Sequence, residues 1–149
     1  MPEHAVGIDV IEIARVRRVL ERHAGRFLER IYTPLEIAYC RGRVSELAAR
    51  FAAKEAVMKA LGTGVRGIAW RDIEVLPNPR GKPLVRLQGM AAARAEAIGL
   101  HQLDISLTHS RAYAVASVVG ETTRMEKGER TARESFADTW LRAIPLRSP

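Results

Sequence analysis

The chain has 149 residues, a hydrophobic fraction of 47% and a formal net charge of +7, which predicts one domain with a substantial core and at most a small appendage. It contains no long apolar run, no signal-peptide pattern after Met1 and one cysteine, Cys40, so we expect a cytoplasmic protein without membrane helices or an internal disulfide. The charge permits nucleic acid, an acidic protein or a phosphorylated small molecule as partner. The chain has only two Trp, three Tyr and three Phe, so few aromatic rings are available to stack on the bases of a single-stranded nucleic acid.

Residues 5–10 read as a short buried strand that is interrupted by Asp9. A carboxylate in such a strand is costly unless it is paired, caps a helix or binds a metal ion. Glu12, three residues later, could complete a capping box or supply a second carboxylate. The sequence leaves these roles open.

Residues 11–27 predict an amphipathic helix, with Ile13, Val16 and Leu20 on its apolar side. Four arginines share a narrow arc on the opposite side if the helix continues through Gly25. The four are Arg15, Arg18, Arg22 and Arg26. A solvated basic face is the ordinary interpretation, and a docking surface for an acidic partner is the sharper one.

The next elements are marked by caps and turns. Thr33, Pro34 and Glu36 predict a capped second helix. Residues 73–76 and 84–87 predict a hairpin, and residues 90–98 predict an alanine-rich helix. A second hairpin is expected from residues 104–109 and 113–119, with the polar residues Ser106, Thr108 and His109 near its tip.

The most informative stretch is residues 50–64, at the end of a helix that Ser45 is expected to cap and Gly62 to terminate. Glu55 and Lys59 are four residues apart at the edge of its apolar face, and Lys54 falls within that face. The plain interpretation is an i,i+4 salt bridge beside a lysine with a covered stem. The alternative is a carboxylate for a hard cation beside two ammonium groups for phosphates.

The composition changes after about Gly120. We therefore divide the chain into a domain of residues 1–120 and an extension of residues 121–149, in which Phe136 and Trp140 favour a short amphipathic helix.

Three separated stretches resemble the motifs of the holo-acyl-carrier-protein synthases, over about residues 5–120. The first is Gly7-Ile8-Asp9-Val10-Ile11-Glu12-Ile13-Ala14-Arg15, and the second runs from Arg50 to Gly64 with its Phe-Ala-Ala-Lys-Glu-Ala core. The third is Ile105-Ser106-Leu107-Thr108-His109, followed by Tyr113-Ala114-Val115-Ala116. The three occur in the order and spacing of that family.

The resemblance implies an α+β fold of the 4′-phosphopantetheinyl transferase type and a homotrimer with active sites between subunits. It also implies an enzyme that moves the phosphopantetheine arm of coenzyme A to a serine of an acidic apo-acyl carrier protein. Such a reaction supports fatty acid biosynthesis and uses Mg²⁺, which prefers oxygen ligands.

Carried over residue by residue, the resemblance implies that Asp9 and Glu55 bind the metal, with Lys59 on the phosphate side. Asp9, acting through a water, and Glu55 are both candidates for the general base. The expected coenzyme A contacts are Arg50, Lys54, Gly62, Thr63, Gly64, Ser106, Thr108 and His109. The family position of Arg15 touches the carrier, whereas Arg18, Arg22 and Arg26 are added from helical geometry.

Two rival hypotheses belong to other classes. A small basic RNA-binding domain would explain the charge but not an acid in a buried strand together with Glu55. An adaptor that uses only the arginine-bearing helix would need no magnesium. We favour the transferase, without nucleic acid or a membrane as partner.

Overall fold

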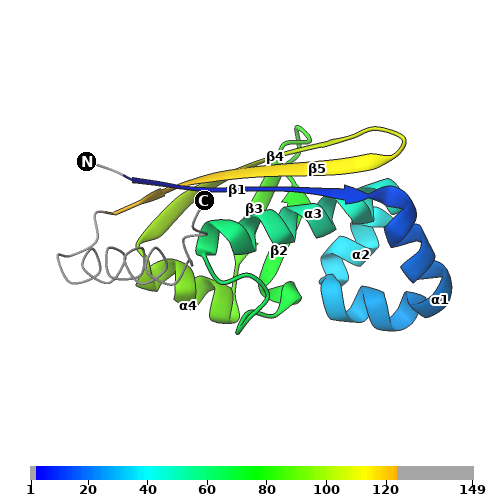
Figure 1. Cartoon of the computed structure of the whole chain (residues 1–149), viewed down its shortest axis with the longest axis horizontal. Helices are drawn as coiled ribbons and strands as arrows, with labels where there is room; N and C mark the ends of the chain where they lie inside the picture. The colour runs from blue at the N-terminus through cyan, green and yellow to red at the C-terminus, as the bar shows by residue number, and fades with distance from the viewer. Residues whose placement is uncertain (1–2, 124–149) are drawn as a thin grey trace, which may run out of the picture.

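The computed structural model describes residues 3–123, which form the ordered succession of strands and helices in Figure 1. In chain order these elements are β1 (Glu3–Glu12), α1 (Ile13–Ile31), α2 (Pro34–Cys40), α3 (Val44–Leu61), the 3-10 helix η1 (Trp70–Asp72), β2 (Ile73–Pro77), β3 (Pro83–Leu87), α4 (Gly89–Ala97), β4 (Leu100–His109) and β5 (Tyr113–Thr122).

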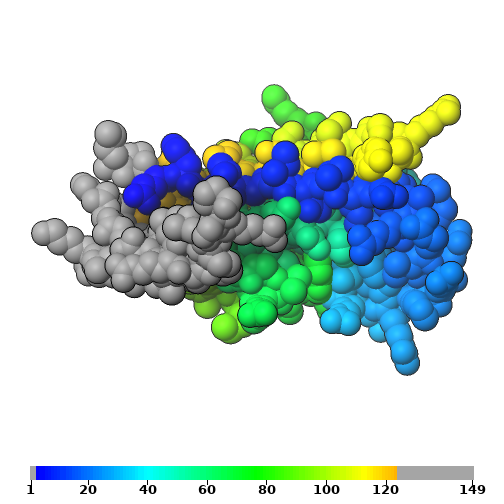
Figure 2. Space-filling view, in the orientation of Figure 1, coloured from blue at the N-terminus to red at the C-terminus, as the bar shows by residue number. Residues whose placement is uncertain are grey.

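A three-stranded antiparallel sheet in the order β1-β5-β4 forms one layer, and β2 and β3 form a separate hairpin. Strand β1 pairs with β5 along its whole length, from Glu3 opposite Thr122 to Glu12 opposite Tyr113. Figure 2 shows these distant segments, blue and yellow, against one another on the surface. The helices lie on one side of the three-stranded sheet (Figure 1), so the expected α+β class is confirmed.

Helix α3 is the centre of the core and packs against both β1 and β5. Small side chains make this close approach possible. Ala52, Ala53 and Ala56 of the helix are completely buried, as are Ala114 and Ala116 on the facing side of β5. The helix is buried around most of its circumference, which explains why its sequence lacks a strong polar face.

A buried polar network joins α2, α3 and β2. The expected capping box of α2 is present, with the Thr33 hydroxyl accepting from the Glu36 backbone N–H and the Glu36 carboxylate accepting from the Thr33 N–H. Glu36 also accepts from Val75 N–H, at 3.0 Å, and from the Lys54 ammonium, at 2.6 Å. The Thr33 hydroxyl donates to Glu74 at 2.6 Å, so every partner is buried yet hydrogen-bonded.

The start and course of α1 differ from the expectation. Strand β1 continues to Glu12 because its backbone stays paired with β5, so Asp9 lies within the strand and caps no helix. Glu12 takes the N-cap position but makes no side-chain capping bond. The helix bends at His23, whose φ of −143° and ψ of 37° are not helical, and Figure 1 shows the change of direction.

The remaining elements agree with the sequence to within a few residues, except at two places. Ser45 does not cap α3, which begins at Val44 with Arg43 as an N-cap that makes no side-chain bond. Strand β4 begins four residues earlier than expected, at Leu100, and contains an irregularity between His101 and Asp104. Within residues 3–123, no helix has the length and apolar character needed to cross a membrane. The amphipathic helix expected around Phe136 and Trp140 lies outside the described residues.

Candidate active site

Asp9 and Glu55 approach one another where β1 crosses α3. Residues of β1 alternate between the two faces of the sheet, which turns Asp9 toward the helix side together with the buried residues Gly7 and Ile11. Glu55 is half-buried on α3. Burial raises the pKa of Glu55, and the nearby Asp9 carboxylate raises it further. Two acids that the sequence separates by 46 positions therefore act on one another electrostatically.

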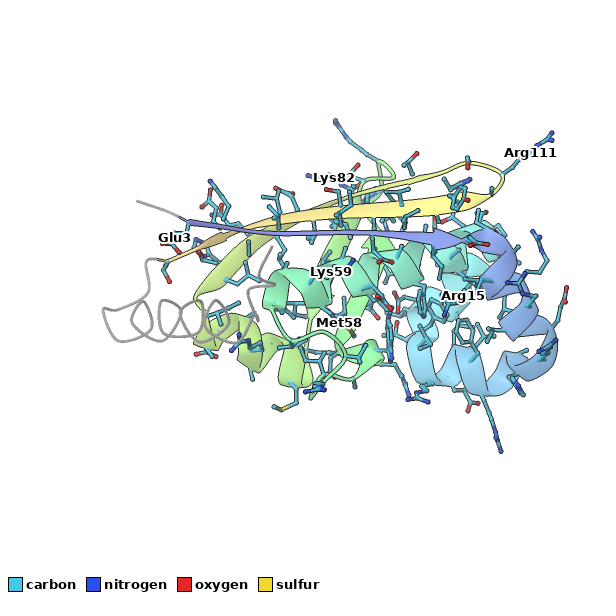
Figure 3. The ribbon with its side chains drawn as sticks, in the orientation of Figure 1. Glu3, Arg15, Met58, Lys59, Lys82 and Arg111 are labelled. Atoms are coloured by element: carbon cyan, nitrogen blue, oxygen red, sulfur yellow. The ribbon has the colours of Figure 1, made fainter. Side chains whose placement is uncertain are left out.

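Lys59 links the same two elements. Its ammonium donates to the backbone carbonyl of Ile8 at 2.8 Å and to Oδ1 of Asp9 at 3.2 Å. The Lys59 side chain is 54% exposed, whereas that of Asp9 is 15% exposed, so the ammonium lies at the open edge of the acid pair. Figure 3 places Lys59 between β1 and α3. Among residues 3–123 its ion pair is with Asp9, which replaces the expected i,i+4 bridge to Glu55.

Arg15 also acts on the acid pair. The positive charges of Lys59 and Arg15 both lower the pKa of Glu55 and so oppose the effects of burial and Asp9. Arg15 lies in the first turn of α1, just after β1 ends, and it is exposed (Figure 3). The result is two carboxylates flanked by two cations, an arrangement that suits a bound cation together with phosphate oxygens.

The donor chemistry of the pair fits Mg²⁺. This ion is held by one or two carboxylates and fills its remaining positions with water and substrate phosphates. Within the described part of the chain no group of three or more His, Cys, Asp or Glu side chains is placed to hold a metal ion. The pair supplies the two carboxylates that such a site needs, and water and substrate phosphates would complete it.

Two of the expected coenzyme A contacts are buried in the structure. The Lys54 side chain is completely buried and donates to Glu36 at 2.6 Å, to Ile73 O at 2.6 Å and to Trp70 O at 3.2 Å. An ammonium group has three donors, so these bonds use all of them. Lys54 thus joins α3 to α2 and to the start of β2 and has no free donor for a ligand.

Arg50 is buried in a similar way. Its Nε donates to Val75 O at 2.9 Å, its Nη1 lies 2.7 Å from Oε2 of Glu46, and its guanidinium stacks 4.5 Å from the centre of the Tyr39 ring. Only 3% of the side chain is exposed. The expectation that Arg50 and Lys54 contact coenzyme A is therefore corrected for the single chain. Both side chains are buried and bind other parts of the same chain.

The third motif is divided between the two faces of the sheet. The strand register places Ser106 beside Ser117 and Ile8, and Thr108 beside Val115 and Val10, on the face away from the helices. His109 pairs with Ala114 and lies on the helix side, like Asp9, but two strands from β1. A single chain therefore does not bring Ser106 and Thr108 to the acid pair.

The Gly62-Thr63-Gly64 loop follows α3 directly, within one turn of Lys59. Gly62 ends the helix in the left-handed conformation with a φ of 73°, as expected, and Gly64 has a φ of 57°. The Thr63 hydroxyl donates to Gly64 O at 3.0 Å. The loop is mostly exposed, so its backbone is open to a ligand at this end of the helix.

A basic cavity of about 770 Å³ lies at the other end of α3, and of its lining residues the sequence analysis predicted only His109 as a ligand contact. Its cationic residues are Arg17, Arg43 and Arg111, and the first residues of α3, Val44 and Ser45, also line it. Figure 3 shows Arg111 at the tip of the β4–β5 hairpin. These arginines come from three separate elements, so no local sequence pattern connects them.

The predicted arginine row is exposed, but the bend in α1 divides it. Arg15, Arg18 and Arg22 precede His23 on a regular helix and keep their common side. Arg26 follows the bend, so its position is no longer that of a straight helix. The helix after the bend packs inward through Phe27, whose ring lies 5.7 Å from that of Tyr32 and 6.2 Å from that of Phe51.

The sheet face opposite the helices is apolar and exposed. Val6, Ile8 and Val10 of β1 are 69%, 63% and 60% exposed, and Tyr113 and Val119 of β5 are 50% and 44% exposed. We call these five residues the outer face. Their alternation with buried neighbours identifies a regular strand surface that the described residues do not cover.

Comparison with known proteins agrees with this arrangement. The model of the 4′-phosphopantetheinyl transferase superfamily matches residues 5–118. The chain is 48% identical over 119 residues to a holo-[acyl-carrier-protein] synthase of Koribacter versatilis, covering 77% of this chain and 95% of the relative. It is 46% identical over 125 residues to one of Moorella thermoacetica, covering 82% and 97%. None of these similarities supports an RNA-binding domain.

Solved structures show the same fold. The Helicobacter pylori holo-[acyl-carrier-protein] synthase in complex with coenzyme A matches with a TM-score of 0.71 and 34% identity, over 77% of this chain and 98% of that one. The enzyme from Neisseria meningitidis matches with a TM-score of 0.73 and 33% identity, over 79% and 98%. The chain therefore belongs to the holo-[acyl-carrier-protein] synthase family of the 4′-phosphopantetheinyl transferase superfamily.

Proposed function

We propose that this protein transfers the 4′-phosphopantetheine group of coenzyme A to a serine of an apo-acyl carrier protein in the cytoplasm, in support of fatty acid biosynthesis. The products are the holo-carrier and adenosine 3′,5′-bisphosphate. The observation that carries the proposal is the pairing of Asp9 and Glu55 beside Lys59, in a chain 48% identical to a holo-[acyl-carrier-protein] synthase.

In this reaction the serine oxygen forms a bond to the β-phosphorus of the pyrophosphate, and the bond from that phosphorus to the bridging oxygen breaks. The serine proton leaves to a base, for which Asp9 through a water and Glu55 remain the two candidates. Asp9 and Glu55 would hold Mg²⁺, which supplies charge neutralisation at the pyrophosphate oxygens. The exposed Lys59 ammonium would stabilise the negative charge that develops on the departing bisphosphate.

We propose that coenzyme A binds in contact with the Gly62-Thr63-Gly64 loop and with residues from the third motif. Ser106 and Thr108 face away from the acid pair of their own chain. They would reach the acid pair of a second copy if the outer face of one chain packed against the β1 edge of the next chain, where Asp9 lies beside α3. The basic cavity beside His109, with Arg17, Arg43 and Arg111, would attract the phosphates of the nucleotide.

A homotrimer is therefore part of the proposal. The outer face presents five large apolar side chains, which is typical of a surface that another protein covers. A trimer in which each outer face covers the β1 edge of the next chain would bury these side chains and would assemble each site from two chains.

The carrier protein would dock on α1. Arg15, Arg18 and Arg22 form an exposed cationic side before the bend, and an acidic carrier complements it. Arg15 extends this surface to the acid pair, because its charge lowers the pKa of Glu55. The serine of a carrier docked on α1 would be delivered to the edge of the site where Lys59 is exposed.

The test is mass spectrometry of apo-acyl carrier protein after incubation with the purified protein, coenzyme A and Mg²⁺. We expect the carrier to gain one phosphopantetheine group, and a carrier whose acceptor serine is replaced by alanine to gain nothing. No mass gain on any acyl carrier from the same cell would exclude the proposed reaction.

A further inference from the structure

Strand β1 crosses α3 with backbone against backbone at Gly7. A Cβ atom added to Gly7 would lie 1.8 Å from the carbonyl oxygen of Ala56 and 2.7 Å from its carbonyl carbon. Real Cβ atoms essentially never come within 3.0 Å of a heavy atom elsewhere in the chain, so the two elements would have to separate by at least about 1.2 Å. The obstacle is backbone, which no side-chain rotation can move aside.

This crossing lies directly beside the acid pair on both elements. Gly7 is two residues before Asp9 on the same face of β1, and Ala56 follows Glu55 on α3. The carbonyl that lies between Gly7 and Asp9, that of Ile8, accepts the hydrogen bond from Lys59. Any change in the distance between β1 and α3 at Gly7 therefore changes the distance between Asp9 and Glu55.

Small side chains fill most of the space between α3 and the sheet around this crossing, next to Val118 of β5, whose Cγ1 would lie 3.1 Å from a Cβ at Gly7. Ala52, Ala53 and Ala56 of α3 and Ala114 and Ala116 of β5 are completely buried between helix and sheet. Alanine keeps the helix near the sheet, but only the missing Cβ at Gly7 permits contact with the helix backbone.

We infer that Gly7 is a positioning residue, whose lack of a side chain sets the separation of the Asp9 and Glu55 carboxylates for one octahedral divalent cation. This inference rests on the proposed function. Mg²⁺ requires near-ideal octahedral geometry, and a misplacement of about 1 Å in a catalytic group can cost about 100-fold in rate.

The experiment measures binding of Mn²⁺, which accepts the same oxygen ligands, from the loss of the free Mn²⁺ signal in electron paramagnetic resonance. It uses the full chain with coenzyme A present, and the Asp9→Asn variant serves as the blank. We expect Gly7→Ala to bind Mn²⁺ at least about 10-fold more weakly than the unmodified protein, as for other losses of support to a metal ligand.

Gly120→Ala is the matched control. A Cβ there would lie 2.5 Å from Leu100 Cδ1 and 2.9 Å from Leu103 Cδ2, so it disturbs packing between β5 and β4. It does not enter the crossing of β1 and α3. We expect Gly120→Ala to lower stability but to keep the Mn²⁺ affinity of the unmodified protein.

A second variant tests the geometric cause. Glutamate is one methylene longer than aspartate, so Asp9→Glu added to Gly7→Ala should reach across the wider gap and recover part of the Mn²⁺ affinity. Asp9→Glu alone should weaken binding. A merely structural role of Gly7 predicts that the two changes weaken binding independently.

The outcomes separate the inference from the proposed function. If the unmodified protein binds Mn²⁺ no better than Asp9→Asn, the proposed metal site fails. If it binds Mn²⁺ and Gly7→Ala binds equally well, the inference about Gly7 is wrong. Should Gly7→Ala be unfolded, the titration is repeated in trimethylamine N-oxide, which favours the compact state. If Gly7→Ala does not fold even then, while Gly120→Ala folds, the close contact at Gly7 serves folding alone and the inference is overturned.

Discussion

The Nζ atom of Lys54 lies 2.6 Å from Oε1 of Glu36, and neither side chain is exposed to solvent. Burial lowers the pKa of Lys54, and the Glu36 carboxylate opposes that effect. Lys54→Met would leave Glu36 as a buried charge without its partner. We expect the free energy of unfolding to fall by about 3–5 kcal/mol.

The check is urea denaturation at matched protein concentrations, with Lys82→Met as the control. Lys82 also pairs with a carboxylate, Asp104, at 3.2 Å, but both side chains are more than half exposed. That change should cost less than about 1 kcal/mol. Equal losses in the two variants would contradict the structural role of the buried pair.

Cys40 should be unreactive in the folded protein. Its side chain is completely buried, and burial raises its pKa from 9.0 to about 11. Because the folded pKa is the higher one, the thiol contributes stability below about pH 9 that is lost as the pH rises toward 11. We expect negligible labelling by a thiol reagent at pH 8 and complete labelling in guanidinium, read by mass spectrometry. Rapid labelling of native protein would place Cys40 at the surface.

The acid pair should be essential for turnover but not for folding. We expect Asp9→Asn and Glu55→Gln each to lower kcat/KM by more than about 100-fold. Loss of a residue that only hydrogen-bonds to a metal ligand costs up to about 100-fold, so loss of the ligand itself should cost more. Removing the charge from Glu55 should not destabilise the protein, because burial and Asp9 both raise its pKa. Glu96→Gln on α4 is the control, since Glu96 is exposed and far along the chain from both motifs. Full activity of either acid variant at ordinary Mg²⁺ would remove the metal assignment.

The outer face should hold the trimer together. We expect Ile8→Glu to produce monomers in sedimentation velocity at micromolar concentration and to lose transferase activity, because it places a charge in the centre of the apolar surface. Leu84→Glu is matched in chemistry, since Leu84 is 50% exposed on the separate β2–β3 hairpin, and it should change neither property. A monomeric unmodified protein with full activity would contradict the proposed assembly.

The arginines before the bend should act on the carrier and not on coenzyme A. We expect Arg18→Glu or Arg22→Glu to raise KM for the carrier while KM for coenzyme A stays nearly constant, and added salt should imitate the change. Arg15→Glu should also lower kcat, because Arg15 acts on Glu55. Arg80→Glu, in the exposed turn between β2 and β3, is the control. If KM for the carrier responds to neither salt nor these charge reversals, the arginines do not bind the carrier and are ordinary exposed residues.

Local patterns in the sequence predicted most of the elements. The capping box at Thr33 and Glu36 and the left-handed end of α3 at Gly62 are formed by residues close in the chain, so both were predictable. The end of β1 was not, because it depends on pairing of Glu12 with Tyr113, a partner 101 positions later. The helix bends at His23, and Phe27 beyond the bend packs against Tyr32 and Phe51, contacts that no helical pattern encodes.

The candidate site shows the same division. Sequence motifs predicted Asp9 and Glu55, and the structure brings them together. The helical periodicity of the sequence placed Lys54 on the apolar face of α3. It could not predict the buried ion pair between Lys54 and Glu36, because Glu36 lies on a different helix, α2. Similarly, the alternation in β4 separates Ser106 and Thr108 from His109, and only the register with β5 and β1 reveals which face carries the acid pair.

The pairing of Glu3 with Thr122 has a consequence for synthesis of the chain on the ribosome. Strand β1 is made first, but its hydrogen-bonding partner β5 is the last described strand. Until β5 has been made, the nascent chain carries an unpaired strand edge with Val6, Ile8 and Val10 exposed, which is a hazard for aggregation. Such long-range pairing also slows folding. Helix α3, which packs against β1 and is made well before β5, is the element that can shelter one face of the strand during this interval.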